Sequence, residues 1–137
     1  MKVMGFNFTK LNAEKSSDNF SNLQIKTHID ISSINELKAD SFKIKENLFG
    51  VKFSYIVEYS PEVAKLEFEG NVLFAIDVKL SKEIIKQWKD KKIQEDFRIF
   101  LFNIILKKSN LKALQLEEEL NLPLHISLPS LKKQEND

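Results

Sequence analysis

The stretch from Val51 to Ile76, "VKFSYIVEYSPEVAKLEFEGNVLFAI", contains two runs in which apolar residues recur at every second position. A Ser60-Pro61-Glu62 turn separates them. Side chains of a β-strand alternate between two faces, so each run predicts a strand with one buried face. Proline at the second position of a turn favours a tight reversal, and we therefore expect an antiparallel hairpin. The residues expected on its apolar face are Val51, Phe53, Tyr55, Val57, Tyr59, Ala64, Leu66, Phe68, Gly70, Val72, Phe74 and Ile76.

Two further strands are expected before this hairpin. "LQIKTHIDIS", which begins at Leu23, alternates in the same way, and a weaker pattern runs through Met4, Phe6 and Phe8. Polar connectors, 11–22 and 33–47, separate the strands. Alternation on one side only favours an antiparallel sheet with one solvated face. A glycine inside a strand, here Gly70, indicates a β-bulge.

The second half of the sequence has helical periodicity. Ser81 is expected to cap a short helix that buries Ile84, Ile85 and Trp88. A longer helix is expected from about Gln94 to about Leu120. The sequence therefore predicts an α+β fold, in which a four-stranded antiparallel sheet is followed by a short and a long helix. We expect a single domain over residues 1–131 and a polar tail over 132–137.

The long helix has two apolar stripes. The first contains Phe102, Ile105, Leu106, Ala113, Leu116 and Leu120. The second contains Phe97, Phe100, Leu101, Ile104 and Leu111. A helix on one sheet needs only one stripe, so the second predicts burial on another side. Either the short helix or the C-terminal segment covers it, or a second subunit does; we expect these five residues to form a homo-oligomer interface.

Composition excludes several classes of function. The 137 residues contain no cysteine and only His28 and His125, so no metal site is expected. Basic and acidic residues number 21 and 20, which gives no global basic field for nucleic acid. The N-terminal sequence lacks a signal-peptide core, and the longest apolar run, 99–106, is too short to span a membrane. These features predict a soluble, cytoplasmic protein without cofactors.

Candidate catalytic residues have simpler explanations. Lys65, Glu67 and Glu69 share the polar face of one strand, where a solvated sheet gives the same pattern. The run Glu117–Glu119 is expected in a solvated turn. Trp88 lies among lysines that suit single-stranded bases, but its helical spacing places it in the core. The sequence therefore predicts no enzyme.

The segment "NLPLHISLPSL", residues 121–131, cannot continue the helix because Pro123 and Pro129 interrupt it. It is also too apolar for a solvated tail. We expect its apolar side chains to pack against the long helix and sheet, weakly enough to be displaced: Leu122, Leu124, Ile126 and Leu128.

The order of these elements, with "NIILKKSNLKAL" in the long helix and "LNLPLHISLPSL" after it, resembles the SecB family of export chaperones from Phe6 to Leu131. The resemblance implies a holdase that binds unfolded polypeptide without ATP, in a dimer or tetramer built through sheet edges and long helices. It also implies an aromatic-lined client groove, partly walled by the terminal segment. The residues expected in this groove are Phe53, Tyr55, Phe68, Phe74, Leu124, Ile126 and Leu128.

Two departures from the family argue against coupling to the export motor SecA. The net charge is +1 rather than strongly acidic, and the sequence after residue 131 is a polar tail rather than a further helix. Clients in export and clients in antitoxin protection both stay open. The alternative function is a structural or regulatory subunit with one fixed protein partner, and an enzyme for a small molecule would need a constellation that the sequence lacks.

Overall fold

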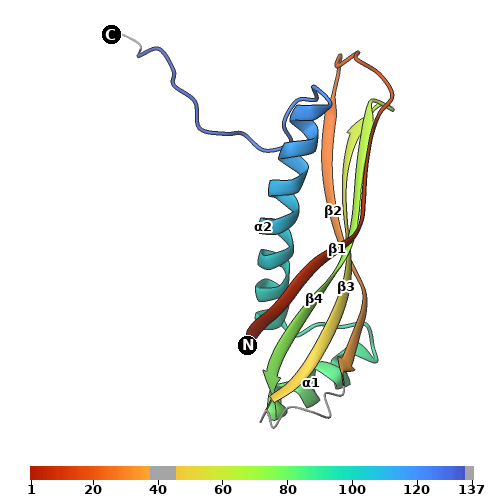
Figure 1. Ribbon diagram of the computed structural model, residues 1–137, viewed down its shortest axis with the longest axis vertical. Helices are drawn as coiled ribbons and strands as arrows, with labels where there is room; N and C mark the ends of the chain where they lie inside the picture. Colours follow the sequence, from red (N-terminus) through yellow and green to blue (C-terminus); the bar gives the residue numbers. More distant parts are fainter. Residues whose placement is uncertain (38–45, 135–137) are drawn as a thin grey trace.

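The computed structural model describes residues 1–37 and 46–134. The chain forms β1 (Lys2–Lys15), β2 (Gln24–Leu37), β3 (Glu46–Ser60), β4 (Ala64–Asp77), α1 (Val78–Trp88) and α2 (Glu95–Glu119). The strands make one antiparallel sheet in the order β1-β4-β3-β2. Figure 1 shows α2 running along one face of this sheet and α1 at one end of it. The predicted α+β fold, with a short and a long helix after the sheet, is confirmed.

The central hairpin of β3 and β4 is the part that the sequence describes best. Tyr55 lies opposite Phe68 in the register, and Val57 lies opposite Leu66. All twelve residues predicted for the apolar face are buried. Lys65 and Glu69 lie exposed on the other face, and Glu67 there is half-buried. Strict alternation over two uninterrupted strands therefore gave the correct faces.

The two outer strands are longer than predicted, because β-bulges hide their alternation. In β1 the pairing skips Met4 and Thr9, so the apolar residues change from even to odd positions after Phe8. Leu11 then continues the face, in a stretch that we expected to be a connector. In β2 the pairing skips Ser32, which puts Ile34 on the same face as Ile31. One extra residue inverts the subsequent alternation.

Gly70 is required by close packing. It lies opposite Phe8 and Phe53, and a Cβ at this position would lie 2.5 Å from the carbonyl oxygen of Asn7 and 2.7 Å from Cζ of Phe53. The bulge beside it belongs to β1, between Phe8 and Lys10, and not to β4 as we predicted. The absence of a side chain at Gly70 therefore leaves room for an aromatic ring and for the backbone of the neighbouring strand.

We expect Gly70→Ala to lower the free energy of unfolding by about 1–3 kcal/mol, the usual cost of overpacking a well-packed core. Chemical denaturation measures this loss. Gly5→Ala is the matched control, because a Cβ at Gly5 meets nothing nearer than 3.8 Å. Equal effects of the two substitutions would show that the contact with Phe53 does not limit position 70.

The start of α1 differs from the prediction. Asp77, and not Ser81, caps the helix, with its carboxylate accepting a hydrogen bond from the backbone N–H of Leu80 at 2.8 Å. Ser81 is buried inside the helix, where its hydroxyl donates to the carbonyl oxygen of Val78 and accepts from the side-chain amide of Asn47. Ile84 is buried as expected, and Trp88 is half-buried.

α2 buries one winding stripe and not two straight ones. Its buried residues follow one another at four-residue steps: Phe97, Leu101, Ile105, Ser109, Ala113 and Glu117. Each step of four residues advances by about 40° around a helix with 3.6 residues per turn. The stripe therefore starts on our second stripe and ends on our first. A twisted sheet under a 25-residue helix explains this, because the direction of the sheet surface turns along the helix.

Candidate functional site

α2 covers the centre of the sheet but leaves apolar side chains half-exposed on the edge strand β1. Val3, Phe6, Phe8 and Leu11 pair with buried residues of β4, so they lie on the face that carries α2. Val3 is 37% exposed and Leu11 is 47% exposed, whereas the two phenylalanines are half-buried. We call this row, Val3, Phe6, Phe8 and Leu11, the β1 rim.

The β1 rim is the outer part of an aromatic cluster that continues into the core. The ring of Phe6 stacks on Phe53 with centroids 5.3 Å apart, and Phe8 meets Phe68 edge-on at 5.7 Å. Phe68 in turn stacks on Tyr55 at 5.5 Å. Aromatic pairs at these distances pack favourably in fixed geometries. The rim therefore offers apolar side chains that rest on a firmly packed base.

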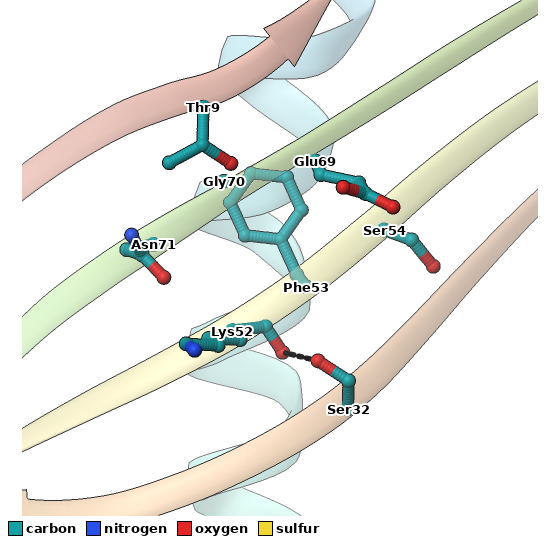
Figure 2. A pocket seen from close by; sticks show the side chains of 8 residues that line it. All are labelled: Thr9, Ser32, Lys52, Phe53, Ser54, Glu69, Gly70 and Asn71. Carbon is teal, nitrogen blue, oxygen red and sulfur yellow. Dashed lines mark hydrogen bonds between the residues drawn. The ribbon is translucent and has the colours of Figure 1, made fainter.

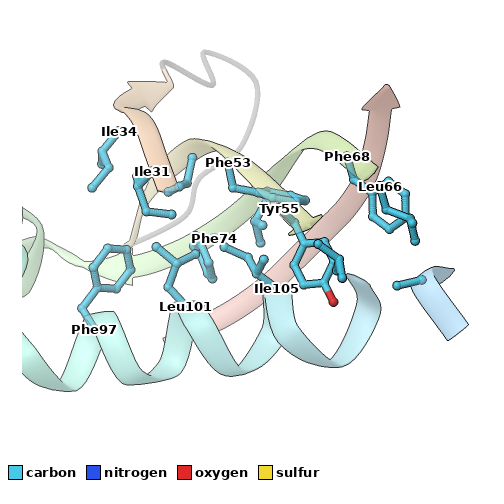
Figure 3. Close-up of a cluster of buried hydrophobic side chains, with 14 of the residues drawn as sticks. Ile31, Ile34, Phe53, Tyr55, Leu66, Phe68, Phe74, Phe97, Leu101 and Ile105 are labelled. Carbon is cyan, nitrogen blue, oxygen red and sulfur yellow. The ribbon is translucent and has the colours of Figure 1, made fainter. Parts of the chain in front are cut away.

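Three of the four sheet residues predicted for the client groove, Phe53, Tyr55 and Phe68, lie in this base, and Phe74 packs against the helix residues Phe97 and Phe100. Phe53 is 2% exposed, and Tyr55, Phe68 and Phe74 are fully buried. Figure 3 shows Phe74 next to Leu101 of the helix, whereas Phe68 lies farther along the sheet beside Leu66. Their assignment as contact residues is corrected here, because all four are buried within the single chain and offer no surface to a client. Phe6 and Phe8 were missed, since the sequence marked their strand only as the weakest of four.

The residues predicted for the oligomer interface divide into three groups. Phe97 and Leu101 are fully buried in the core of the single chain, so their assignment to an interface is corrected. Phe100 and Ile104 are half-buried, and the ring of Phe100 lies 5.6 Å from that of Phe74. Leu111 is 57% exposed. A second exposed apolar position on α2 is Ile99, which is 48% exposed, with Phe102 and Leu106 half-buried beside it.

The C-terminal segment packs through fewer apolar side chains than predicted. Leu122 is buried, but Leu124 and Ile126 are each 37% exposed and Leu128 is 54% exposed. The prediction that all four pack against the helix and sheet is therefore wrong for Leu128, whereas Leu124 and Ile126 are partly covered. The end of the described chain, residues 127–134, leaves the body of the molecule, as Figure 1 shows, and Leu131 is fully exposed.

A buried polar cluster, and not those apolar side chains, holds the segment against the body of the molecule. The carboxylate of Glu117 accepts hydrogen bonds from the backbone N–H of His125 at 2.9 Å and from its Nδ1 at 2.7 Å. The side chains of Glu117 and His125 are 0% and 3% exposed. On the other side of the ring, Nε2 lies 3.0 Å from Oη of Tyr55 and 3.1 Å from Oδ1 of Asn110. We call Glu117, His125, Tyr55 and Asn110 the C-terminal latch.

Tyrosine hydroxyls complete this attachment. Oη of Tyr55 donates to Asn110 at 2.6 Å, and Oη of Tyr59 donates to the carbonyl oxygen of Pro123 at 2.6 Å. Burial, and then the charge of Glu117, raise the pKa of Tyr55 and the pKa of Tyr59 well above the ordinary value. Both hydroxyls therefore stay protonated donors at neutral pH.

Sequence reasoning placed Glu117 in a solvated turn and gave no role to His125, and the structure corrects both expectations. The run Glu117–Glu119 has the composition of a solvated surface, and only Glu117 is turned inward. His125 between two apolar residues was the available signal, because a polar residue at an inward position requires a buried partner.

The face of the sheet opposite α2 is polar over most of its length. In the register, Lys26, Glu58, Lys65 and Glu14 lie side by side across the four strands, so the charges alternate in sign. Figure 2 shows a depression of about 460 Å³ on this face, lined by Lys52, Glu69, Asn71 and three hydroxyl side chains, with the Phe53 ring beside Gly70. This face has mixed polarity and lacks the aromatic row of the β1 rim.

At one end of the polar face lies a smaller apolar depression of about 290 Å³. Leu37, Gly50, Val72 and Leu73 contribute to its lining. Leu37 is 44% exposed. It provides an apolar position on the opposite face from Leu11.

Within residues 1–37 and 46–134, no group of three or more His, Cys, Asp or Glu side chains is arranged to hold a metal ion. In the same ranges, no helix is long and apolar enough to cross a membrane.

No protein-family model matches the sequence, and no curated protein matches it. Among solved structures, the fold is similar to that of the Mycobacterium tuberculosis Rv1957 SecB-like chaperone in complex with a ChAD peptide from the Rv1956 HigA1 antitoxin. The two chains share 17% identity with a TM-score of 0.58, and the match covers 96% of this chain and 89% of that chain. The four-stranded antiparallel sheet followed by two helices is thus a SecB-like fold.

Proposed function

We propose that the protein is an ATP-independent chaperone that holds extended apolar segments of unfolded polypeptides at the β1 rim. The observation that carries this proposal is the row of half-exposed apolar side chains beside α2, seated on the buried aromatic cluster. An apolar row of this kind accepts many sequences, because burial of apolar area is not directional. The similar structure of a SecB-like chaperone bound to an antitoxin peptide supports a polypeptide ligand.

The two bulges of β1 influence how a peptide binds. β1 is an edge strand, and a flat edge would pair with any extended chain through its backbone. Skipped pairing at Met4 and Thr9 interrupts the regular edge. Recognition then depends on the side chains of the rim more than on a continuous hydrogen-bond ladder.

Leu11→Asp tests the site. It should weaken binding of an unfolded client by about tenfold or more, since burying a leucine contributes roughly 1.5–3 kcal/mol and 1.4 kcal/mol is a factor of ten. Fluorescence anisotropy with a labelled, permanently unfolded chain measures the affinity. Leu37→Asp is the matched control, because this leucine has similar exposure on the opposite face. Equal losses from both substitutions would remove the β1 rim as the binding surface.

Suppression of aggregation separates the chaperone from the alternative, a structural or regulatory subunit with one fixed partner. A chaperone should keep several unrelated unfolded proteins in solution, and Leu11→Asp should reduce this activity. Binding to one folded protein, without protection of unrelated chains, would favour the alternative. Across the described part of the polar face, charges of both signs alternate in the row that runs from Lys26 to Glu14, unlike an acidic docking surface, so we propose holding of clients in the cytoplasm without the export motor SecA.

We also propose a homo-oligomer, with the exposed side of α2 around Ile99 as one contact. The apolar side chains there are not covered by the described part of the chain. Ile99→Asp should lower the sedimentation coefficient at micromolar concentration while the circular dichroism spectrum stays unchanged. Leu111→Asp, on an exposed position nearer the C-terminal end of α2, should leave the assembly intact. A wild-type mass of one chain would contradict this contact.

A further inference from the structure

The chain after Ile126 has no packing of its own in the described structure. Leu128 is 54% exposed and Leu131 is fully exposed, although a leucine gains most from burial. Figure 1 shows this tail, residues 127–134, running away from both the sheet and α2. A surface outside the body of the chain would bury these two leucines and so stabilise the docked tail.

The C-terminal latch fixes the point from which the tail departs. His125 is held by Glu117 on one side of its ring and by Tyr55 and Asn110 on the other. Tyr59 holds the carbonyl oxygen of Pro123 only two residues earlier. Several short contacts to buried groups on β3 and α2 leave this root little freedom. The tail is therefore aimed outward as long as the latch is intact.

The chain also contains a surface of matching character and length. Residues 127–134 span at most about 26–29 Å when extended. The β1 rim from Val3 to Leu11 has a length of roughly 27 Å at the rise of a β-strand. Pro129 keeps the tail out of a helix, and the apolar side chains that it presents to such a surface are Leu128 and Leu131, followed by the polar residues 132–134.

We propose that the tail, residues 127–134, binds the β1 rim of a second copy of this chain, with Leu128 and Leu131 against the rim. A second copy is favoured over the same chain because the latch directs the tail away from its own sheet. It is favoured over an unrelated protein because the apolar tail and the uncovered rim are both present in every copy. Mutual exchange of tails between two copies gives a closed, symmetric contact.

This inference rests on the proposed function, since it assigns the rim an occupant that a client must displace. The tail then acts as an internal competitor that covers the apolar rim while no client is present. Removing residues 127–134 should increase client affinity. A charge in the rim, as in Leu11→Asp, should weaken tail binding and client binding together, whereas cysteine at this position stays apolar.

Disulfide cross-linking tests the contact without any client, so its outcome is separate from that of the chaperone assay. The chain has no cysteine, and each engineered thiol is therefore unique. Ser130→Cys is placed on one chain and Leu11→Cys on a second chain of different size, and the mixture is mildly oxidised. We expect the mixed disulfide in roughly tenfold higher yield than with Leu37→Cys on the opposite face, because docking gives a millimolar effective concentration. Adding Leu128→Asp to the tail should reduce the yield to that of the control.

Three results would overturn the proposal. Equal yields with Leu11→Cys and Leu37→Cys would show random collision. Absence of the mixed product would show that the tail does not reach the rim. A chain carrying both Ser130→Cys and Leu11→Cys that closes within itself, with a yield independent of protein concentration, would show that the tail binds its own rim.

Discussion

His125→Ala is expected to lower the free energy of unfolding by about 3–5 kcal/mol, the usual cost of leaving a buried charge without its partner. Among the residues that the structure describes, His125 is the only basic side chain in contact with the carboxylate of Glu117. That carboxylate is fully buried, so water does not replace the lost imidazole. Urea denaturation followed by circular dichroism measures the change.

Glu117→Gln, introduced into the wild type and into His125→Ala, tests the reason for the loss. The amide oxygen still accepts hydrogen bonds but carries no charge, so the single substitution should cost about 1–2 kcal/mol. The double variant should be more stable than His125→Ala alone, because the unpaired charge is gone. His28→Ala, at an exposed position of β2, should stay within about 0.5 kcal/mol of the wild type. Additive losses in the double variant would show that Glu117 and His125 stabilise the fold independently.

Phe97→Ala is the second substitution with a large expected effect, about 3–5 kcal/mol for truncating a buried phenylalanine. The ring is fully buried and meets Phe74 at 5.6 Å, so removing it leaves a cavity between α2 and the sheet. Leu111→Ala, on an exposed position of the same helix, should change stability by less than about 0.5 kcal/mol. Denaturation of both variants at several protein concentrations gives the comparison.

This pair of variants distinguishes the winding stripe from a subunit interface. If Phe97 were an interface residue, its loss would dissociate the assembly and make stability depend on protein concentration. A concentration-independent loss of stability agrees with burial inside one chain. Unchanged stability with a lower sedimentation coefficient would contradict the core position that the structure gives to Phe97.

The sequence predicts the fold well where periodicity is uninterrupted. β3 and β4 alternate without a break from Val51 to Ile76, and both faces follow from that pattern. In β1 one skipped residue at Thr9 inverts the alternation, so a 14-residue strand looks like a short one. In α2 the four-residue steps drift around the helix, and a wheel drawn for a straight helix divides one stripe into two. Curvature and bulges depend on tertiary packing, which a periodic pattern does not contain.

The candidate site was predicted less completely, because exposure depends on which element covers which strand. Aromatic residues at Phe53 and Phe68 were correctly placed on the apolar face, but they are buried, and Phe6 and Phe8 pack against them as the half-buried residues of the rim. The C-terminal latch joins residues far apart in the sequence, from Tyr55 to His125. A single polar residue in an apolar segment signals that a partner exists. It does not say which of the buried carboxylates or hydroxyls will be near it.

The central claim is that unfolded polypeptide binds the β1 rim, and methyl NMR of the intact protein tests it most directly. Adding a permanently unfolded client should shift or broaden the methyl signals of Val3, Met4 and Leu11, which are exposed in β1. The signals of Leu37 and Leu73, around the depression on the opposite face, should stay in place. Changes confined to Leu37 and Leu73, with the β1 signals unaltered at saturating client, would contradict the account.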